Sequence, residues 1–139
     1  MTQAEGDGVA YATTTREITV RVRSYYLEEQ SSPDDCRFVF AYRIRIENHG
    51  QATVQLRSRY WRITDGNGHT EEVRGAGVVG EQPVLAPGEA FEYTSGCPLA
   101  TPSGIMVGNY EMQGDDGRRF EVQIPAFSLD SPHQTGPVN

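Results

Sequence analysis

One stretch of strictly alternating side chains most constrains what this chain can fold into. Large apolar residues share one parity, at Phe38, Phe40, Tyr42, Ile44 and Ile46. Successive side chains of a strand point to opposite faces, whereas a helix needs an apolar period near 3.6. The stretch therefore predicts a long β-strand with one buried face.

Weaker patterns of the same kind fill most of the chain, and no segment has a helical period. They cover residues 18–27, 54–63, 69–74, 91–93, 105–112, 120–124 and 127–129. Turn signals separate them at intervals of about 8–12 residues, which is typical of sandwiches. We therefore predict an all-β fold, an immunoglobulin/fibronectin type III-like β-sandwich of about seven to nine antiparallel strands.

Four local features refine this prediction. The apolar phase changes at Tyr60–Trp61, which predicts either a β-bulge or a strand that crosses a sheet edge there. Residues 65–68, Asp-Gly-Asn-Gly, predict a hairpin with a type I′ turn. We expect residues 95–104, which hold two prolines, to form an irregular link. Pro125 predicts that the last strand lies at a sheet edge.

Length and charge limit the classes of function. A chain of 139 residues suits one domain, which we place at residues 9–132, with flexible tails at 1–8 and 133–139. The net charge of −7 argues against nucleic acid as a partner, and no apolar run is long enough for membrane insertion. With no signal-peptide pattern, we expect a cytoplasmic protein with reduced Cys36 and Cys97, although a disulfide stays open.

A glycine cluster at residues 75–80, Gly-Ala-Gly-Val-Val-Gly, matches the dinucleotide-binding pattern. That chemistry needs a strand before the cluster and a helix after it, whose N-terminus meets the pyrophosphate. Pro83 disfavours a helix there, and Glu81 would place a negative charge beside the phosphate. We expect a glycine-rich loop instead. A nucleotide- or pyrophosphate-binding protein or hydrolase remains the alternative.

Metal-ligand and catalytic patterns are weak. The three histidines share no ligand spacing, and residues 65–76 lack the glycine and the acid that a calcium loop requires. A weak divalent-cation contact by His69, Glu71 and Glu72 is left open beside a solvated hairpin. Ser95 and Cys97 have no neighbouring base in the sequence. We therefore expect no metal site, no cofactor and no enzymatic activity.

All twelve basic residues are arginines. Arg21, Arg23, Arg43 and Arg45 lie on the polar parity of two predicted strands, so pairing of those strands would place them on one sheet surface. One interpretation is a surface for an anion or an acidic partner, which suits arginine. The other is cross-strand pairing with Glu17 and Glu47. Aromatic residues beside this surface are anchors or core, namely Tyr25, Tyr26, Tyr60 and Trp61.

Longer motifs connect these features. They read Ser58-x-x-Trp61-x-Ile63-Thr64-Asp65, Val73-x-Gly75-x-Gly77-Val78-Val79-Gly80-Glu81-Gln82-Pro83, Leu85-x-Pro87-Gly88, Tyr93-Thr94-Ser95-Gly96 and Thr101-Pro102-x-Gly104-x-Met106-x-Gly108-x-Tyr110. In these motifs the chain resembles the bacterial ApaG family from about Val9 to Pro132. Tyr60 stands where the resemblance leads us to expect histidine.

The resemblance implies a fibronectin type III-like sandwich without known catalytic activity. It also implies a link to cobalt resistance and magnesium efflux, and a role in protein–protein binding like that of related domains in F-box proteins. We therefore expect a non-enzymatic accessory factor with an unidentified protein partner, and we leave open a homodimer formed through a strand edge. The candidate interaction surface comprises Arg59, Tyr60, Trp61, Gly75, Gly77, Gly80, Glu81 and Gln82.

Overall fold

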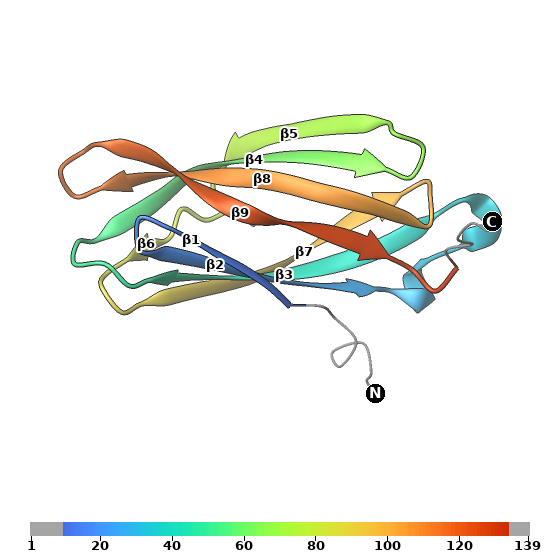
Figure 1. Ribbon diagram of the computed structural model, residues 1–139, viewed down its shortest axis with the longest axis horizontal. Coiled ribbons are helices and arrows are strands. Elements are labelled where there is room, and N and C mark those ends of the chain that lie inside the picture. The colour runs from blue at the N-terminus through green and yellow to red at the C-terminus, as the bar shows by residue number, and fades with distance from the viewer. Residues whose placement is uncertain (1–9, 134–139) are drawn as a thin grey trace.

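Two antiparallel sheets packed face to face make up the computed structural model, which describes residues 10–133 (Figure 1). Nine strands and two short 3-10 helices occupy the described residues, so the predicted all-β sandwich is confirmed. The predicted tails lie outside the described residues, except for His133, whose ring packs edge-on against Tyr26 at 5.6 Å. No helix in residues 10–133 has the length and apolar character needed to cross a membrane.

The first sheet has the strand order β1-β2-β3-β7. Its strands are β1 (Ala10–Thr15), β2 (Ile18–Tyr26), β3 (Phe38–Asn48) and β7 (Ala90–Leu99). The long alternating stretch forms β3, and its apolar parity faces the second sheet because those side chains are buried. The β2–β3 connection holds the 3-10 helices η1 (Glu28–Gln30) and η2 (Pro33–Asp35).

The second sheet has the order β5-β4-β8-β9, with β6 also paired to β4. Its strands are β4 (Val54–Asp65), β5 (Thr70–Ala76), β6 (Val84–Leu85), β8 (Ser103–Gly114) and β9 (Arg119–Asp130). Both β5 and β6 pair with β4, β6 with its first residues and β5 with its second half. β9 lies at the sheet edge, as Pro125 predicted.

Aromatic side chains join the two sheets. Trp61 of β4 is 3% exposed and packs edge-on against Tyr42 and Phe127, with ring centroids 5.4 and 5.8 Å away. The hydroxyls of Tyr93 and Tyr110 share a buried hydrogen bond of 2.5 Å between β7 and β8. The expectation that Trp61 belongs to an interaction surface is therefore wrong, because its ring fills the core.

Polar contacts close one side of the sandwich, where β1 and β2 meet β9. The Tyr11 and Ser128 hydroxyls lie 3.1 Å apart, and Ser24 Oγ donates to the Ser128 carbonyl at 3.0 Å. Across the same seam, the Gln123 amide donates to Thr15 Oγ1 at 3.2 Å. The open strand edges of the two sheets are therefore β5 and β7, on the opposite side.

Three local expectations need correction. β1 was not predicted. It turns into β2 through Arg16 and Glu17, which have φ of 48° and 68° and form a type I′ turn. Such turns favour asparagine, aspartate and glycine, so Arg-Glu gives no turn signal in the sequence. Residues 95–99, which we expected to be irregular, continue β7. Pro98 is tolerated because β7 is an edge strand, where an outward-facing backbone N–H has no neighbouring strand to bond to. The hairpin at residues 65–68 is real, but only Gly68 has a positive φ, so its turn is type I rather than I′.

Replacing Gly108 by alanine should destabilise the fold strongly. An added Cβ would lie 2.2 Å from the Tyr60 carbonyl oxygen and 2.9 Å from the Trp61 ring. We expect a loss of about 2–4 kcal/mol in the free energy of unfolding, measured by urea denaturation, with a changed tryptophan fluorescence. Gly96→Ala is the matched control, since its added Cβ would meet only Phe40 O at 3.5 Å. Equal stability of the two variants would contradict this account of the core.

Candidate functional site

A β-bulge in β4 determines where the candidate site lies. The register against β8 shifts between Leu56 and Ser58, which leaves Arg57 unopposed. The shift changes the parity of the strand, so Leu56 and Trp61 both face the core. The predicted bulge therefore exists, but at Arg57 and not at Tyr60–Trp61.

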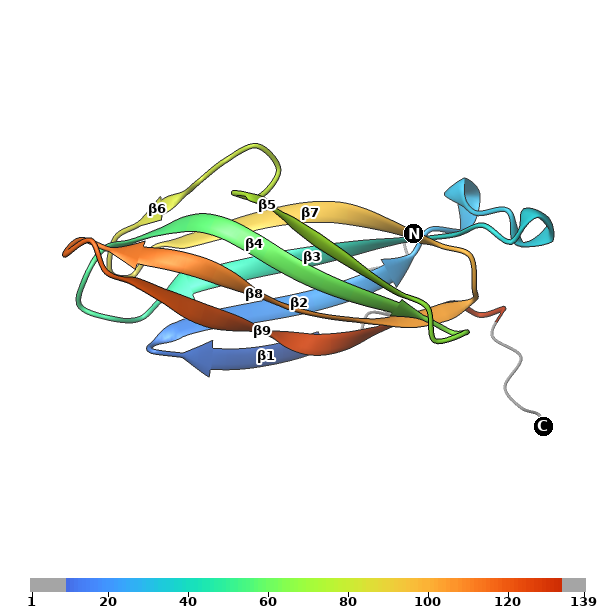
Figure 2. The same ribbon diagram turned by 90° about the horizontal axis from the view of Figure 1, so that it is seen from above.

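The glycine-rich segment docks on this bulge. We call residues 77–83, which connect β5 to β6, the glycine loop. The Arg57 carbonyl accepts hydrogen bonds from the Gly77 amide at 2.9 Å and from Gln82 Nε2 at 2.8 Å. The Leu56 amide donates to the Pro83 carbonyl at 3.0 Å. Both ends of the loop are thus fixed to β4, and Figure 2 shows the loop arching beyond the strands it connects.

The tip of the loop is a two-residue hairpin. The Val78 amide donates to the Glu81 carbonyl at 2.8 Å, and the Glu81 amide donates back at 2.9 Å. Between them Val79 and Gly80 have φ of 43° and 82°, as a type I′ turn requires. Val78 is buried in the core, whereas Val79 is 54% exposed. The loop therefore combines a buried anchor with an exposed apolar tip.

Arg59 supports the loop from the inner side of β4. Its Nη1 donates to the carbonyls of Ala76 at 3.2 Å and Gly77 at 2.9 Å. The guanidinium occupies the space beside Gly75, where an added Cβ would lie 2.8 Å from Nη1. Arg59 thus supports the loop through these two hydrogen bonds, while its side chain stays partly exposed.

Three buried tyrosines lie near this guanidinium. Burial raises the pKa values of Tyr42, Tyr93 and Tyr110 above their ordinary range, and the positive charge of Arg59 offsets only part of that effect. The phenols therefore stay protonated and act as hydrogen-bonding parts of the core.

Tyr60 lies on the outer face of the second sheet, on the opposite side of β4 from Arg59. Its hydroxyl donates to Glu72 at 2.9 Å, and the Arg74 guanidinium carbon lies 4.3 Å from the centre of its ring. The hydrogen bond to Glu72 raises the pKa of Tyr60. The structure thus separates the predicted surface residues: the loop tip with Gly80, Glu81 and Gln82 is exposed, Tyr60 lies on the sheet face, and Gly77 is buried.

The loop does not have the geometry of a dinucleotide site. It joins β5 to β6, which both run antiparallel to β4, and the short strand β6 rather than a helix follows it, so there is no helix N-terminus at the loop to meet a phosphate. The amides of Gly77, Val78 and Glu81 already donate to backbone carbonyls. The geometry therefore gives no support to the nucleotide alternative.

Residues considered for metal binding and catalysis also lie apart. Glu71 and Glu72 are adjacent on β5 and therefore point to opposite faces of the strand. The Glu72 carboxylate accepts a hydrogen bond from the Tyr60 hydroxyl. His69 Nδ1 lies 3.5 Å from Asp65 Oδ2. Within residues 10–133, no group of three or more His, Cys, Asp or Glu side chains is arranged to hold a metal ion. Cys36 and Cys97 are free thiols. Burial, aided by the charge of Glu71, raises the pKa of Cys97 to about 11, which disfavours a nucleophilic thiolate.

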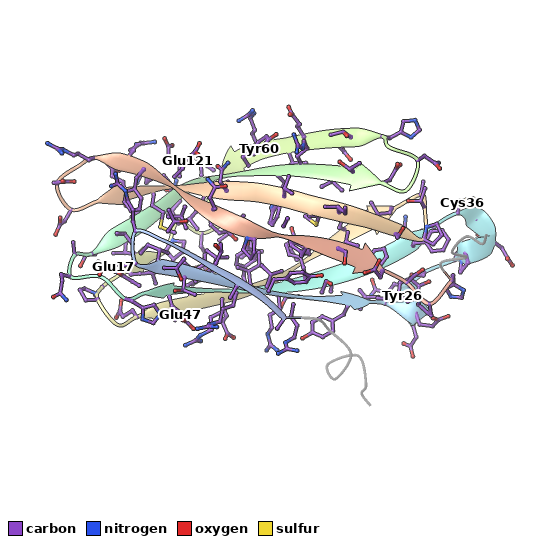
Figure 3. All side chains as sticks on the ribbon, in the orientation of Figure 1. Glu17, Tyr26, Cys36, Glu47, Tyr60 and Glu121 are labelled. Carbon is purple, nitrogen blue, oxygen red and sulfur yellow. The ribbon has the colours of Figure 1, made fainter. Side chains whose placement is uncertain are left out.

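The arginines of the first sheet do share one surface, as predicted. Arg21 lies opposite Arg45 and Arg23 opposite Arg43 in the β2–β3 register. Glu47 accepts from Arg21 at 3.0 Å and Arg45 at 2.7 Å, and Arg45 also reaches Glu92 at 2.9 Å. Cross-strand pairing with Glu47 is therefore observed for Arg21 and Arg45. Glu17, the other expected partner, lies in the β1–β2 turn. Figure 3 shows Glu47 and Tyr60 on opposite sides of the sandwich.

The glycine loop yields a test of its own geometry. Gly77→Ala should cost more than about 3 kcal/mol in unfolding free energy, because the left-handed φ of 64° is strained and the new Cβ would lie 2.3 Å from Glu81 O. Gly80→Ala should cost only about 1 kcal/mol, since nothing lies within 4 Å of its added Cβ. Chemical denaturation of both variants checks this. Similar losses would show that the loop is not closed as described.

The ion pairs of Glu47 should make the free energy of unfolding depend on pH in the acid range. Hydrogen bonds from Arg21, Arg45 and His49 hold the pKa of Glu47 at about 2, below its ordinary 4.5. The stabilisation is therefore complete above pH 4.5 and is lost as the pH falls toward 2. Glu47→Gln should lower stability at neutral pH by about 1–2 kcal/mol, because solvent screens these partly exposed pairs. Denaturation of both proteins across this range should show the gap closing in acid; a constant gap would contradict the assignment.

Comparison with known proteins identifies the family. Residues 28–114 match the ApaG domain family model. The chain is 62% identical to Protein ApaG of Paramagnetospirillum magneticum over 129 residues, covering 93% of this chain and 99% of that protein. It is 61% identical, with the same coverage, to Protein ApaG of Brucella anthropi.

A solved structure agrees with this match. The crystal structure of the putative ApaA protein from Bordetella pertussis superimposes with a TM-score of 0.81 at 54% identity, covering 84% of this chain and 95% of that one. The agreement extends over both sheets of the sandwich because most of each chain is superimposed. The sequence and the fold together show that this chain belongs to the ApaG family.

Proposed function

We propose that this chain is a non-enzymatic protein-recognition module of the cytoplasm, an accessory factor in cobalt resistance and magnesium efflux. In this proposal the tip of the glycine loop contacts an unidentified protein partner. The observation that carries the proposal is the conformation of Val79, an exposed apolar residue held at φ of 43°. The link to cobalt and magnesium rests on the resemblance to the ApaG family alone.

Valine is conformationally strained at position 79, where the backbone is left-handed. A β-branched residue in the left-handed region is an outlier, and such strain costs about 1–3 kcal/mol. Asparagine before glycine would fit the same type I′ turn with far less strain. At 54% exposure, the apolar side chain at this position gains only part of the stabilisation that full burial would give. Strain of this kind gathers at sites of function, which favours recognition by a partner.

The surroundings of Val79 suit a binding surface. Val84, close by in the sequence, is 56% exposed, and Glu81 and Gln82 add exposed polar groups. The bonds to Arg57 and from Arg59 fix the loop before any partner arrives. A preorganised loop avoids the entropic cost of ordering on binding. The loop thus has a small apolar centre, a polar rim and a fixed shape, as protein interfaces do.

A partner would also connect this fold to ion homeostasis without a metal site of its own. The candidate ligands His69, Glu71 and Glu72 do not form a group that could hold a metal ion, so the proposal assigns transport of the ion to another protein. This chain would then act by binding that transporter or a regulator of it.

Val79→Asn should separate stability from recognition. We expect the free energy of unfolding to rise by about 1 kcal/mol, because asparagine relieves the left-handed strain before Gly80. Partner binding and the cobalt tolerance of cells that depend on this protein should fall. Ile105→Asn is the matched control, since Ile105 is 52% exposed on β8, away from the loop. Full cobalt tolerance with Val79→Asn, or an equal loss with Ile105→Asn, would contradict the proposed surface.

The partner itself can be found by site-specific photo-crosslinking in living cells. A photoreactive residue at Glu81 should yield a discrete crosslinked protein, and the same residue at position 105 should not. Introducing Val79→Asn beside the crosslinker should remove the product. A product that persists with Val79→Asn would argue against recognition through the tip.

A further inference from the structure

We propose that a depression at one end of the sandwich binds a small zwitterion with an apolar side chain, namely a free α-amino acid. The depression has a volume of about 360 Å³, and residues of both sheets line it. Three connections meet there, the β1–β2 turn, the β3–β4 connection and the β8–β9 turn, which lie at the same end of the molecule in Figures 1 and 2. We call it the end pocket. The inference does not rest on the function proposed above.

The floor of the end pocket is apolar. Ile18 of the first sheet and Val54 of the second line it and are 1% and 7% exposed. Phe120 of the second sheet also lines it and packs against the core. Small-molecule pockets start at about 300 Å³ and are mostly apolar with a few placed polar groups. The floor therefore suits a short aliphatic or aromatic side chain.

Two strained residues supply the charges beside this floor. Arg16 and Glu17 form the β1–β2 turn with φ of 48° and 68°, and both line the end pocket. A left-handed backbone is unfavourable for both, whereas Asn-Gly would form the same turn without that strain. Backbone strain concentrates at functional sites. An arginine and a glutamate in these two positions therefore point to a use for their charges.

The two opposite charges are held apart. The Arg16 guanidinium carbon lies 5.2 Å from the centre of the Phe120 ring on β9. Glu17 faces the β3–β4 connection instead, where a Cβ added to Gly50 would lie 3.1 Å from its Oε1. Within residues 10–133, neither Arg16 nor Glu17 forms an ion pair. The end pocket thus has one positive and one negative wall, and both charges can bind a ligand.

This separation of charge identifies the class of ligand. Consecutive residues have Cα atoms about 3.8 Å apart, so one small molecule can reach both side chains. The guanidinium of Arg16 would bind a carboxylate in bidentate fashion, and the carboxylate of Glu17 would accept hydrogen bonds from an ammonium group. An α-amino acid carries both groups on one carbon atom. Its side chain would then lie on the apolar floor.

The rim of the end pocket disfavours other small ligands. Asp115, Asp116 and Arg118 of the β8–β9 turn also line it, so two arginines stand against three acids and the lining has a net charge of −1. A phosphate or another polyanion would be repelled by this excess of acids. A polyamine would gain nothing from the apolar floor. A zwitterion with an apolar side chain has neither disadvantage.

An NMR titration of the isotope-labelled, full-length protein with L-leucine tests the proposal. We expect saturable amide shifts confined to residues 16–18, 50–54 and 114–120, with a dissociation constant below about 1 mM. Three analogues are the matched probes: leucinamide lacks the carboxylate, N-acetyl-leucine lacks the ammonium group and glycine lacks the apolar side chain. Each should bind at least about tenfold more weakly than leucine.

Variants separate binding from stability. Glu17→Gln should weaken leucine binding at least about tenfold and leave the melting temperature unchanged, since this exposed carboxylate forms no ion pair within residues 10–133. Glu121→Gln removes the same charge from an exposed position on β9 and should bind like the wild type; Figure 3 labels both glutamates. Arg16→Asn/Glu17→Gly should melt at a higher temperature, because its turn is unstrained, and should bind no leucine.

Several outcomes would overturn the inference. Absence of saturable leucine binding, or affinity for leucinamide or N-acetyl-leucine equal to that for leucine, would exclude a site for a zwitterion. Glycine binding as tight as leucine binding would show that the apolar floor is not used. Unchanged affinity of Glu17→Gln would place the site elsewhere. A lower melting temperature of Arg16→Asn/Glu17→Gly would contradict the strain assigned to the turn.

Discussion

The one-residue bulge at Arg57 is the constraint on which the rest of the structure depends. Without it, the parity of Val54 and Leu56 would continue along β4 and turn Trp61 toward solvent. With it, Trp61 enters the core against Tyr42 and Phe127, and Gly108 leaves the space its ring needs. The bulged residue also presents its carbonyl to the glycine loop, so one extra residue organises both the core and the candidate site.

The glycines of residues 75–80 support the tip of the loop, which we propose as the recognition surface. Gly75 makes room for the Arg59 guanidinium, Gly77 permits a contact with the Glu81 carbonyl that no side chain would allow, and Gly80 completes the turn. Each glycine therefore has a steric or conformational reason that involves no phosphate. What remains exposed is Val79 with its polar neighbours, on a loop held rigid from below.

Much of the fold could be predicted from the sequence, because a period of two is unambiguous where five large apolar residues alternate, as in β3. The edge position of β9 followed from Pro125 for a similarly local reason. β1 could not be predicted, since its alternation is weak and its turn uses Arg16 and Glu17 in place of glycine or asparagine. The site was predicted only in part. We placed Arg59, Tyr60 and Trp61 on one surface because they are adjacent in the sequence. Successive side chains of a strand point to opposite faces, so Tyr60 points outward and its two neighbours point inward. The bulge position, three residues from its expected place, depends on pairing with β8 and leaves no local signal.

The central claim is that the glycine loop is preorganised by hydrogen bonds to β4 and within its own tip. Hydrogen exchange of backbone amides in the isolated protein, followed by NMR, tests this claim most directly. The account predicts slow exchange for Gly77, Val78 and Glu81, whose amides donate to carbonyl oxygens, at rates like those of the β4 amides paired with β8. Exchange of these three amides as fast as in an unstructured peptide would contradict it, and would mean that the loop takes its shape only when a partner binds.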